Sequence, residues 1–123
     1  MTRFRATLTN TALFLTIASA APLAFAHAHP KTMIPTKDAV VDSAPPAVTI
    51  NYTEGLAARF SKIDVSDAAG QAVSSGPSTV DPKESTRMSV PLKPLKAGSY
   101  TVHWVAVADD GHRTQGDYTF TVK

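Results

Sequence analysis

The chain has 123 residues with no cysteine, 12 Lys+Arg against 10 Asp+Glu, and a formal net charge of +2. This length fits one domain with one modest core, and the lack of thiols excludes disulfides and thiolate metal ligands. A charge this small gives no indication of nucleic acid or of an anionic membrane surface as a partner.

The first 26 residues have the three parts of a secretory signal peptide. Arg3 and Arg5 form a basic start, residues 12–18 form an apolar core, and Ala24-Phe25-Ala26 is a small-x-small cleavage site. The sequence therefore predicts a signal peptide over residues 1–26, cut after Ala26, and a periplasmic domain over residues 27–123. Both arginines leave with the signal, so the mature chain has ten basic and ten acidic residues and a formal charge of zero. No stable membrane insertion is expected after cleavage.

The pattern of the first half of the mature chain predicts short strands, separated by connections rich in Pro, Gly, Ser and Asp. Residues 47–54 alternate between apolar and polar side chains, and residues 60–65 form a second strand candidate. Asp67 to Gly70 is typical of a hairpin turn. Residues 88–92 form a shorter candidate with Pro91 and Pro94 at its end, as expected for an edge strand or a strand end.

The clearest strand runs from Ser99 to Ala108, with Tyr100, Val102 and Trp104 on one face. The turn 109–112 and a last strand over 117–123 follow it. Residues 27–123 show no helical periodicity over three turns. The pattern predicts an all-β sandwich or barrel, and an immunoglobulin-like Greek key sandwich fits it.

Two segments carry candidate metal ligands. Cleavage after Ala26 makes His27 the terminal residue, which then offers a metal its α-amine and its imidazole. Asp110 and His112 flank Gly111 and add a carboxylate and a second imidazole. Three nitrogens and one oxygen in a roughly planar set suit Cu(II) better than other common divalent ions. In a precursor that still carries residues 1–26, His27 has no free amine and the site is incomplete.

Two further residues have alternative interpretations. Glu54 continues the core-facing parity of its strand, where it could accept a hydrogen bond from a metal ligand; alternatively, it lies in the turn before Gly55 and faces water. His29, in third position after cleavage, could bind Cu(II) locally with the terminal amine. We favour the folded site because it also explains Asp110 and His112.

The remaining candidates are assigned structural roles. His103 lies on the polar face of its strand and is interpreted as a surface histidine. Met33 and Met88 are isolated, and we expect them to be packed rather than metal-bound.

With these features, the chain resembles the CopC-type periplasmic copper-binding proteins over essentially all of residues 27–123. The specific part of the resemblance is His27 combined with Asp110-Gly111-His112. The other matching segments are residues 52–56, 64–70, 97–104 and 116–122.

The resemblance implies a cupredoxin-like or immunoglobulin-like Greek key β-barrel that binds one Cu(II) at one end. It implies His27 (amine and imidazole), Asp110 and His112 as ligands, with Glu54 in support. It also implies a non-enzymatic role in copper resistance or homeostasis and an inner-membrane CopD-type copper transporter as partner. Some members carry a Met-rich Cu(I) loop, but residues 65–78 here contain neither Met nor His.

Two other functions are compatible with the sequence. A terminal histidine with a second histidine also holds copper in oxidative copper enzymes, although Asp110 would occupy a position that such chemistry needs open. A metal-free immunoglobulin-like interaction module is the other alternative.

Overall fold

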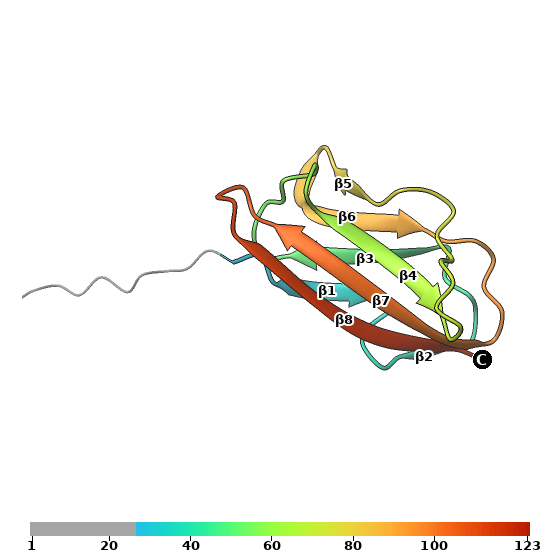
Figure 1. Cartoon of the computed structure of the whole chain (residues 1–123). Coiled ribbons are helices and arrows are strands. Elements are labelled where there is room, and N and C mark those ends of the chain that lie inside the picture. The colour runs from blue at the N-terminus through green and yellow to red at the C-terminus, as the bar shows by residue number, and fades with distance from the viewer. Residues whose placement is uncertain (1–26) are drawn as a thin grey trace, which may run out of the picture.

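Residues 27–123 form a sandwich of two four-stranded sheets in the computed structural model, which describes this part of the chain (Figure 1). The strands are β1 (Pro30–Ile34), β2 (Val40–Val41), β3 (Ala47–Tyr52), β4 (Lys62–Asp67), β5 (Thr79–Asp81), β6 (Glu84–Pro91), β7 (Gly98–Val107) and β8 (Arg113–Val122). The predicted signal peptide lies outside the described residues.

The strand order is that of an immunoglobulin-like Greek key. One sheet has the order β1-β3-β6-β5 and the other β2-β8-β7-β4. All pairs are antiparallel except β2 with β8, which run parallel. Consecutive strands repeatedly cross between the two sheets, as they do in immunoglobulin domains. The predicted fold class is confirmed.

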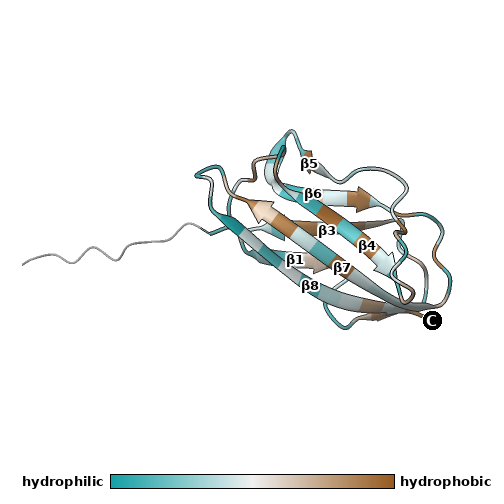
Figure 2. Ribbon diagram, in the orientation of Figure 1, coloured by the Kyte–Doolittle hydropathy of each residue, from teal (hydrophilic) through white to brown (hydrophobic). Residues whose placement is uncertain are grey.

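The core lies between the sheets and is built from the alternating residues of the longer strands. One side of each strand faces inward and the other faces solvent, which produces the banded hydropathy in Figure 2. The buried side chains include Val48, Ile50, Ile63, Val65, Met88, Val90, Val102 and Phe120. The predicted inward faces of β3, β4, β7 and β8 are therefore confirmed, as is the packing of Met88.

An aromatic cluster fills the core near one end of the sandwich. The rings of Tyr52 and Trp104 meet edge to face, with centroids 5.6 Å apart. Gly116 makes room for the indole, because a Cβ there would lie 2.8 Å from an atom of the Trp104 ring. Tyr118, two residues further along β8, is also buried. Within residues 27–123, the hydroxyls of Tyr52 and Tyr118 have no hydrogen-bond partner.

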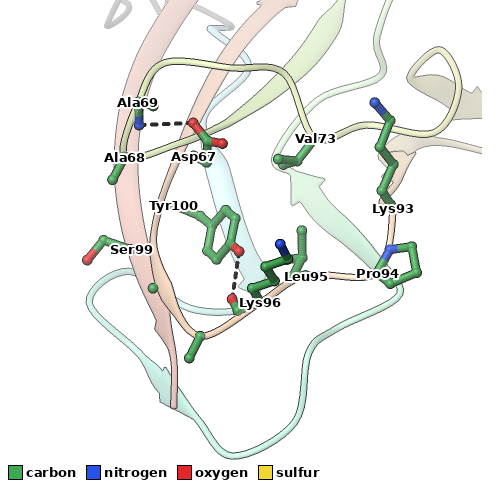
Figure 3. Close-up of a pocket in the computed structure, with 12 residues that line it drawn as sticks. Asp67, Ala68, Ala69, Val73, Lys93, Pro94, Leu95, Lys96, Ser99 and Tyr100 are labelled. Carbon is green, nitrogen blue, oxygen red and sulfur yellow. Dashed lines mark hydrogen bonds between the residues drawn. The ribbon is translucent and has the colours of Figure 1, made fainter.

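The opposite end of the sandwich contains a tyrosine corner. The hydroxyl of Tyr100, at the start of β7, donates a hydrogen bond to the Lys96 carbonyl at 2.6 Å (Figure 3). This contact fixes the β6–β7 connection, as it does in immunoglobulin-like domains. The predicted turn at Asp67 lies beside it, with Gly70 at a φ of 79° and the Asp67 carboxylate accepting from the Ala69 amide.

Several strand predictions need correction. β6 is neither short nor at an edge, since it spans eight residues between β3 and β5. Pro91 is its last residue, so the alternative of a strand end is confirmed. β8 begins at Arg113, four residues earlier than expected. Phe60 lies in a turn before β4 and is 64% exposed. Val105, expected on the polar face of β7, is buried there outside the main core.

Residues 27–123 contain no helix long and apolar enough to span a membrane.

Candidate metal centre

Three segments distant in sequence meet at one end of the sandwich, which we call the His27 pole: residues 27–29, 53–56 and 109–112. β1 runs antiparallel to β3, so the residues before Pro30 pass the end of β3 beside Thr53. β7 and β8 pair from Gly98 to Val122, and their connecting turn projects at the same end (Figure 1). The fold therefore brings the two segments with predicted ligands together.

Hydrogen bonds fix the residues that follow the predicted cleavage site. The Thr53 hydroxyl donates to the His27 carbonyl at 3.3 Å and accepts from the His29 amide at 3.1 Å. From the other sheet, the Thr114 hydroxyl donates to the carbonyl of Ala28, which is fully buried. The backbone of residues 27–29 is thus held by both sheets.

The 109–112 turn has a defined conformation anchored to the same pole. Gly111 has a φ of 90°, a region that glycine adopts without strain. Its amide donates to the Ala108 carbonyl at 2.9 Å, and the Ala108 amide donates to the His112 carbonyl at 2.9 Å. The Asp109 amide donates to the Gly55 carbonyl at 3.1 Å, which connects the turn to the 53–56 segment.

The predicted ligands lie side by side in this frame. The imidazole centroids of His27 and His112 are 5.0 Å apart. The Asp110 carboxylate accepts from the His112 amide at 3.0 Å and lies 2.9 Å from His112 Nδ1. The backbone hydrogen bond from His112, then its side chain, holds the pKa of Asp110 below its usual range, and the His27 side chain adds to this. Asp110 is therefore a carboxylate at neutral pH.

Other sequence candidates lie near the pole with different relations to it. The His29 ring is exposed, with its centroid 6.0 Å from that of His27. Glu54 lies in a bend after β3 and is exposed, so the interpretation that it faces the core is wrong. The alternation of inward-facing and outward-facing side chains along β3 ends at Tyr52, because the chain bends away at residues 53–54 to reach Gly55. A supporting role for Glu54 stays a prediction.

Across residues 27–123, no three His, Asp or Glu side chains are grouped closely enough to hold a metal by themselves. In the full-length chain the nitrogen of His27 is a peptide nitrogen, because residue 26 precedes it. The pole thus holds two neighbouring imidazoles, one of them in contact with a carboxylate, on a segment whose first nitrogen would be freed by cleavage.

Sequence reasoning missed the residues that position this site. Thr53 and Thr114 hold the N-terminal segment but are not metal ligands, so a search for ligands passes over them. Thr114 could have been noticed in the sequence, because it lies on the same inward-facing side of the last strand as Tyr118 and Phe120. A polar side chain at such a position needs a hydrogen-bond partner. This need becomes visible only when β8 is extended back to Arg113.

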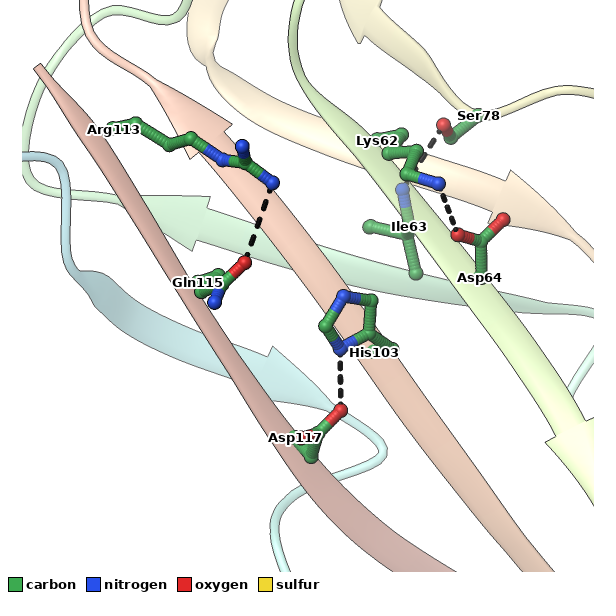
Figure 4. Close-up of polar contacts among 8 residues, drawn as sticks. All are labelled: Lys62, Ile63, Asp64, Ser78, His103, Arg113, Gln115 and Asp117. Carbon is green, nitrogen blue, oxygen red and sulfur yellow. Dashed lines mark hydrogen bonds and ion pairs between the residues drawn. The ribbon is translucent and has the colours of Figure 1, made fainter.

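His103 is a surface residue, as predicted, and lies away from the pole. It projects from the outer face of β7 and hydrogen-bonds Asp117 of β8 through Nδ1 (Figure 4). Its side chain is 41% exposed. Met33 packs partly buried against the core, also as predicted.

Comparison with known proteins gives consistent matches. The CopC domain model matches residues 31–123. Protein YobA of Escherichia coli K12 is 37% identical over 110 residues, 89% of each chain. Copper resistance protein C of Escherichia coli is 37% identical over 109 residues, covering 81% of this chain and 84% of the relative. The crystal structure of CopC from Methylosinus trichosporium OB3b superposes with a TM-score of 0.74 at 25% identity, covering 79% of this chain and 94% of that one.

Proposed function

The chain belongs to the CopC family, and on that premise we propose that it is an exported Cu(II)-binding protein of copper homeostasis and resistance. It would hold one Cu(II) per chain as cargo, with no catalytic step. Relatives named copper resistance protein C support the copper assignment. The finer assignment, of ligands and oxidation state, is supported by the chemistry of the His27 pole.

The observation that carries the proposal is the meeting of His27 and His112, 85 positions apart in sequence, with centroids separated by 5.0 Å. Imidazole and carboxylate donors, with no thiolate in the chain, suit Cu(II). A free α-amine at His27 would add a nitrogen from a residue that already supplies an imidazole. The proposed ligand set is the His27 amine and imidazole, the His112 imidazole and the Asp110 carboxylate.

Each residue has a distinct task in this proposal. His27 would bind through two nitrogens, which requires its backbone to be fixed, and Thr53 and Thr114 fix it. Asp110 lies 2.9 Å from His112 Nδ1 and would supply the carboxylate ligand. A metal binds the amine and the imidazoles only in their neutral forms. Copper uptake would therefore release protons.

The proposal includes the cellular context implied by the family resemblance. Export, cleavage after Ala26 and a periplasmic location are needed to generate the His27 amine. An inner-membrane CopD-type copper transporter would be the partner that exchanges the metal. Glu54 and His29 remain candidates for a supporting contact and an alternative ligand, respectively.

The experiment is a paired Cu(II) titration on two versions of residues 27–123, the range that contains all eight described strands. One version begins at a free His27, and the other carries one Met before it. We expect one-to-one binding by the first, and at least about tenfold weaker binding with a changed electron paramagnetic resonance spectrum by the second. Equal binding by both would remove the amine from the site and contradict the proposal.

A further inference from the structure

A groove of about 500 Å³ lies on the outer face of the β2-β8-β7-β4 sheet, next to the His27 pole. Its walls come from the turn before β4, from the neighbouring ends of β4, β7 and β8, and from the 109–112 turn. It is lined by Phe60, Lys62, Val105, Val107, Gly111 and Arg113. None of these residues is among the predicted copper ligands.

The floor of the groove is apolar although it lies on the solvent side of the sheet. Phe60 leaves 64% of its surface exposed, beside Val105 and Val107. The guanidinium of Arg59 sits 5.9 Å from the Phe60 ring centroid. An exposed aromatic ring beside arginine is a combination enriched where proteins dock. The groove can therefore receive an apolar side chain.

The rim of the groove is positively charged. Lys62 is neutralised by Asp64 at 2.9 Å, whereas Arg113 contacts the neutral Gln115 at 3.3 Å (Figure 4). Over residues 27–123, neither Arg59 nor Arg113 forms an ion pair with a carboxylate. Arg113 lines the groove, and Arg59 adjoins it through its contact with Phe60. Both positive charges lie in this region of a mature chain whose formal net charge is zero.

The acidic residues of the neighbouring turn do not cancel this charge. The Asp109 carboxylate is turned toward Gly55, where a Cβ would lie 2.6 Å from Oδ2. The Asp110 carboxylate is occupied by His112. Two guanidinium groups therefore remain available to carboxylates from outside the molecule, and guanidinium binds carboxylate in a planar, two-point geometry.

We propose that this groove is a docking site for an acidic segment of a partner protein, with an apolar side chain seated against Phe60, Val105 and Val107. Carboxylates flanking that side chain would meet Arg59 and Arg113. The inference goes beyond copper binding and does not depend on it. Gly111 is part of the groove, so a docked segment would lie beside His112.

The test uses metal-free, isotope-labelled protein expressed from the full 123-residue sequence and two synthetic peptides. The first probe is a capped hexapeptide, Glu-Glu-Leu-Phe-Glu-Glu, and the second replaces its Leu-Phe by Gly-Ser. We expect amide shifts from the first probe concentrated at residues 60–62, 105–107 and 111–113. The second probe should bind at least about fivefold more weakly, because it lacks the apolar side chains.

Charge-reversal variants show whether the arginines make the contact. Arg59→Glu and Arg113→Glu should each raise the peptide Kd about tenfold. Lys93→Glu is the matched control, because Lys93 lines the pocket at the far end of the sandwich. An equal loss in Lys93→Glu would indicate general charge attraction and overturn the proposal. So would an absence of groove shifts at millimolar peptide.

Two other occupants give different results in the same experiment. A second copy of the chain would produce shifts at the groove that grow with protein concentration in the absence of peptide. An anionic lipid surface would produce co-sedimentation with phosphatidylglycerol vesicles that Arg113→Glu abolishes. Either result would replace the acidic segment as occupant. Because the protein is metal-free, these outcomes are independent of whether His27 binds copper.

Discussion

The contact between Asp110 and His112 holds two candidate metal ligands side by side. The carboxylate is fixed by the His112 amide and aligned with His112 Nδ1. The lowered pKa of Asp110 keeps its side chain charged at neutral pH, which is the form that a cation would bind. In the proposed site, this preorganisation would lower the entropic cost of ordering the two side chains on binding.

Replacing His112 tests that role directly. We expect His112→Ala to weaken Cu(II) binding at least about tenfold, because even a supporting group of a metal site is worth that much. His103→Ala is the matched control, since His103 pairs with Asp117 on the outer sheet face. Isothermal titration of both variants, each starting at a free His27, gives the comparison. Unchanged affinity in His112→Ala would contradict the folded site.

The candidate ligands could be predicted from the sequence because their chemistry is rare there. The chain has four histidines, and two of them fall at a cleavage site and in an Asp-Gly-His turn. The positioning residues could not be predicted in this way. Thr53 and Thr114 resemble any strand threonine until the pairing of β1 with β3, and of β7 with β8, places them against residues 27–29.

At the scale of elements, the N-terminal segment is the part of the site under most constraint. β1 contacts only β3 within its sheet, yet residues 27–29 before it are held by hydroxyls from both sheets. The carbonyl of the buried Ala28 depends on the Thr114 hydroxyl for its hydrogen bond. A water molecule could take the place of that hydroxyl only if a cavity were present to hold it. The segment is therefore part of the folded domain.

Removing the Thr114 hydroxyl should loosen this segment. We expect Thr114→Val to lower the free energy of unfolding by about 1–3 kcal/mol, because it leaves a buried carbonyl without a donor. Copper affinity should fall with it, since His27 is then less well placed. Thr119→Val, on the exposed face of the same strand, should change stability by less than about 0.5 kcal/mol. Urea unfolding and Cu(II) titration on both variants test the prediction, and equal losses would refute it.

Long strands were predictable and short ones were not. β7 and β8 alternate over ten residues each, and this period-2 pattern is visible in the sequence. β2 has two residues, β5 has three, and β1 is largely exposed, so none of them repeats an inward pattern often enough to be recognised. The first half of β6 is polar, so the sequence did not indicate a strand there. It is nevertheless an interior strand, because β3 and β5 both pair with it through backbone hydrogen bonds, which do not depend on the side chains.

At the scale of the whole molecule, stability without disulfides depends on the core between the sheets, including its two buried phenols. Burial raises the pKa of Tyr118 to about 12. Burial, and secondarily the charge of Tyr118, also raises the pKa of Tyr52. Both hydroxyls lack hydrogen-bond partners among residues 27–123, so the fold tolerates them only as neutral groups.

This predicts a loss of stability in alkali. Well below pH 10 both phenols are neutral in the folded and unfolded states, and their full contribution is present. As the pH rises from about 10 to 12, the unfolded chain loses these protons first, so each phenol costs about 1.4 kcal/mol of folding free energy per pH unit. Urea unfolding at pH 8 and pH 11 measures the loss.

The variant Tyr52→Phe/Tyr118→Phe provides the control. It should be at least as stable as the parent at pH 8, because it removes no hydrogen bond, and it should lose less stability at pH 11. Tyr100→Phe removes a hydroxyl that is bonded to Lys96 and should retain the parent's alkaline loss. The same pH dependence in the double variant would show that other groups cause it.

The placement of Lys123 has a practical consequence. The last residue lies at the end of the sandwich remote from the His27 pole, where its amide bonds the Val41 carbonyl at 3.0 Å (Figure 1). A tether, a reporter or a second protein module joined after Lys123 would therefore extend away from residues 27–29 and 109–112. Molecules attached to a surface through Lys123 would all present the His27 pole to the solution. This orientation is suited to a copper-sensing film.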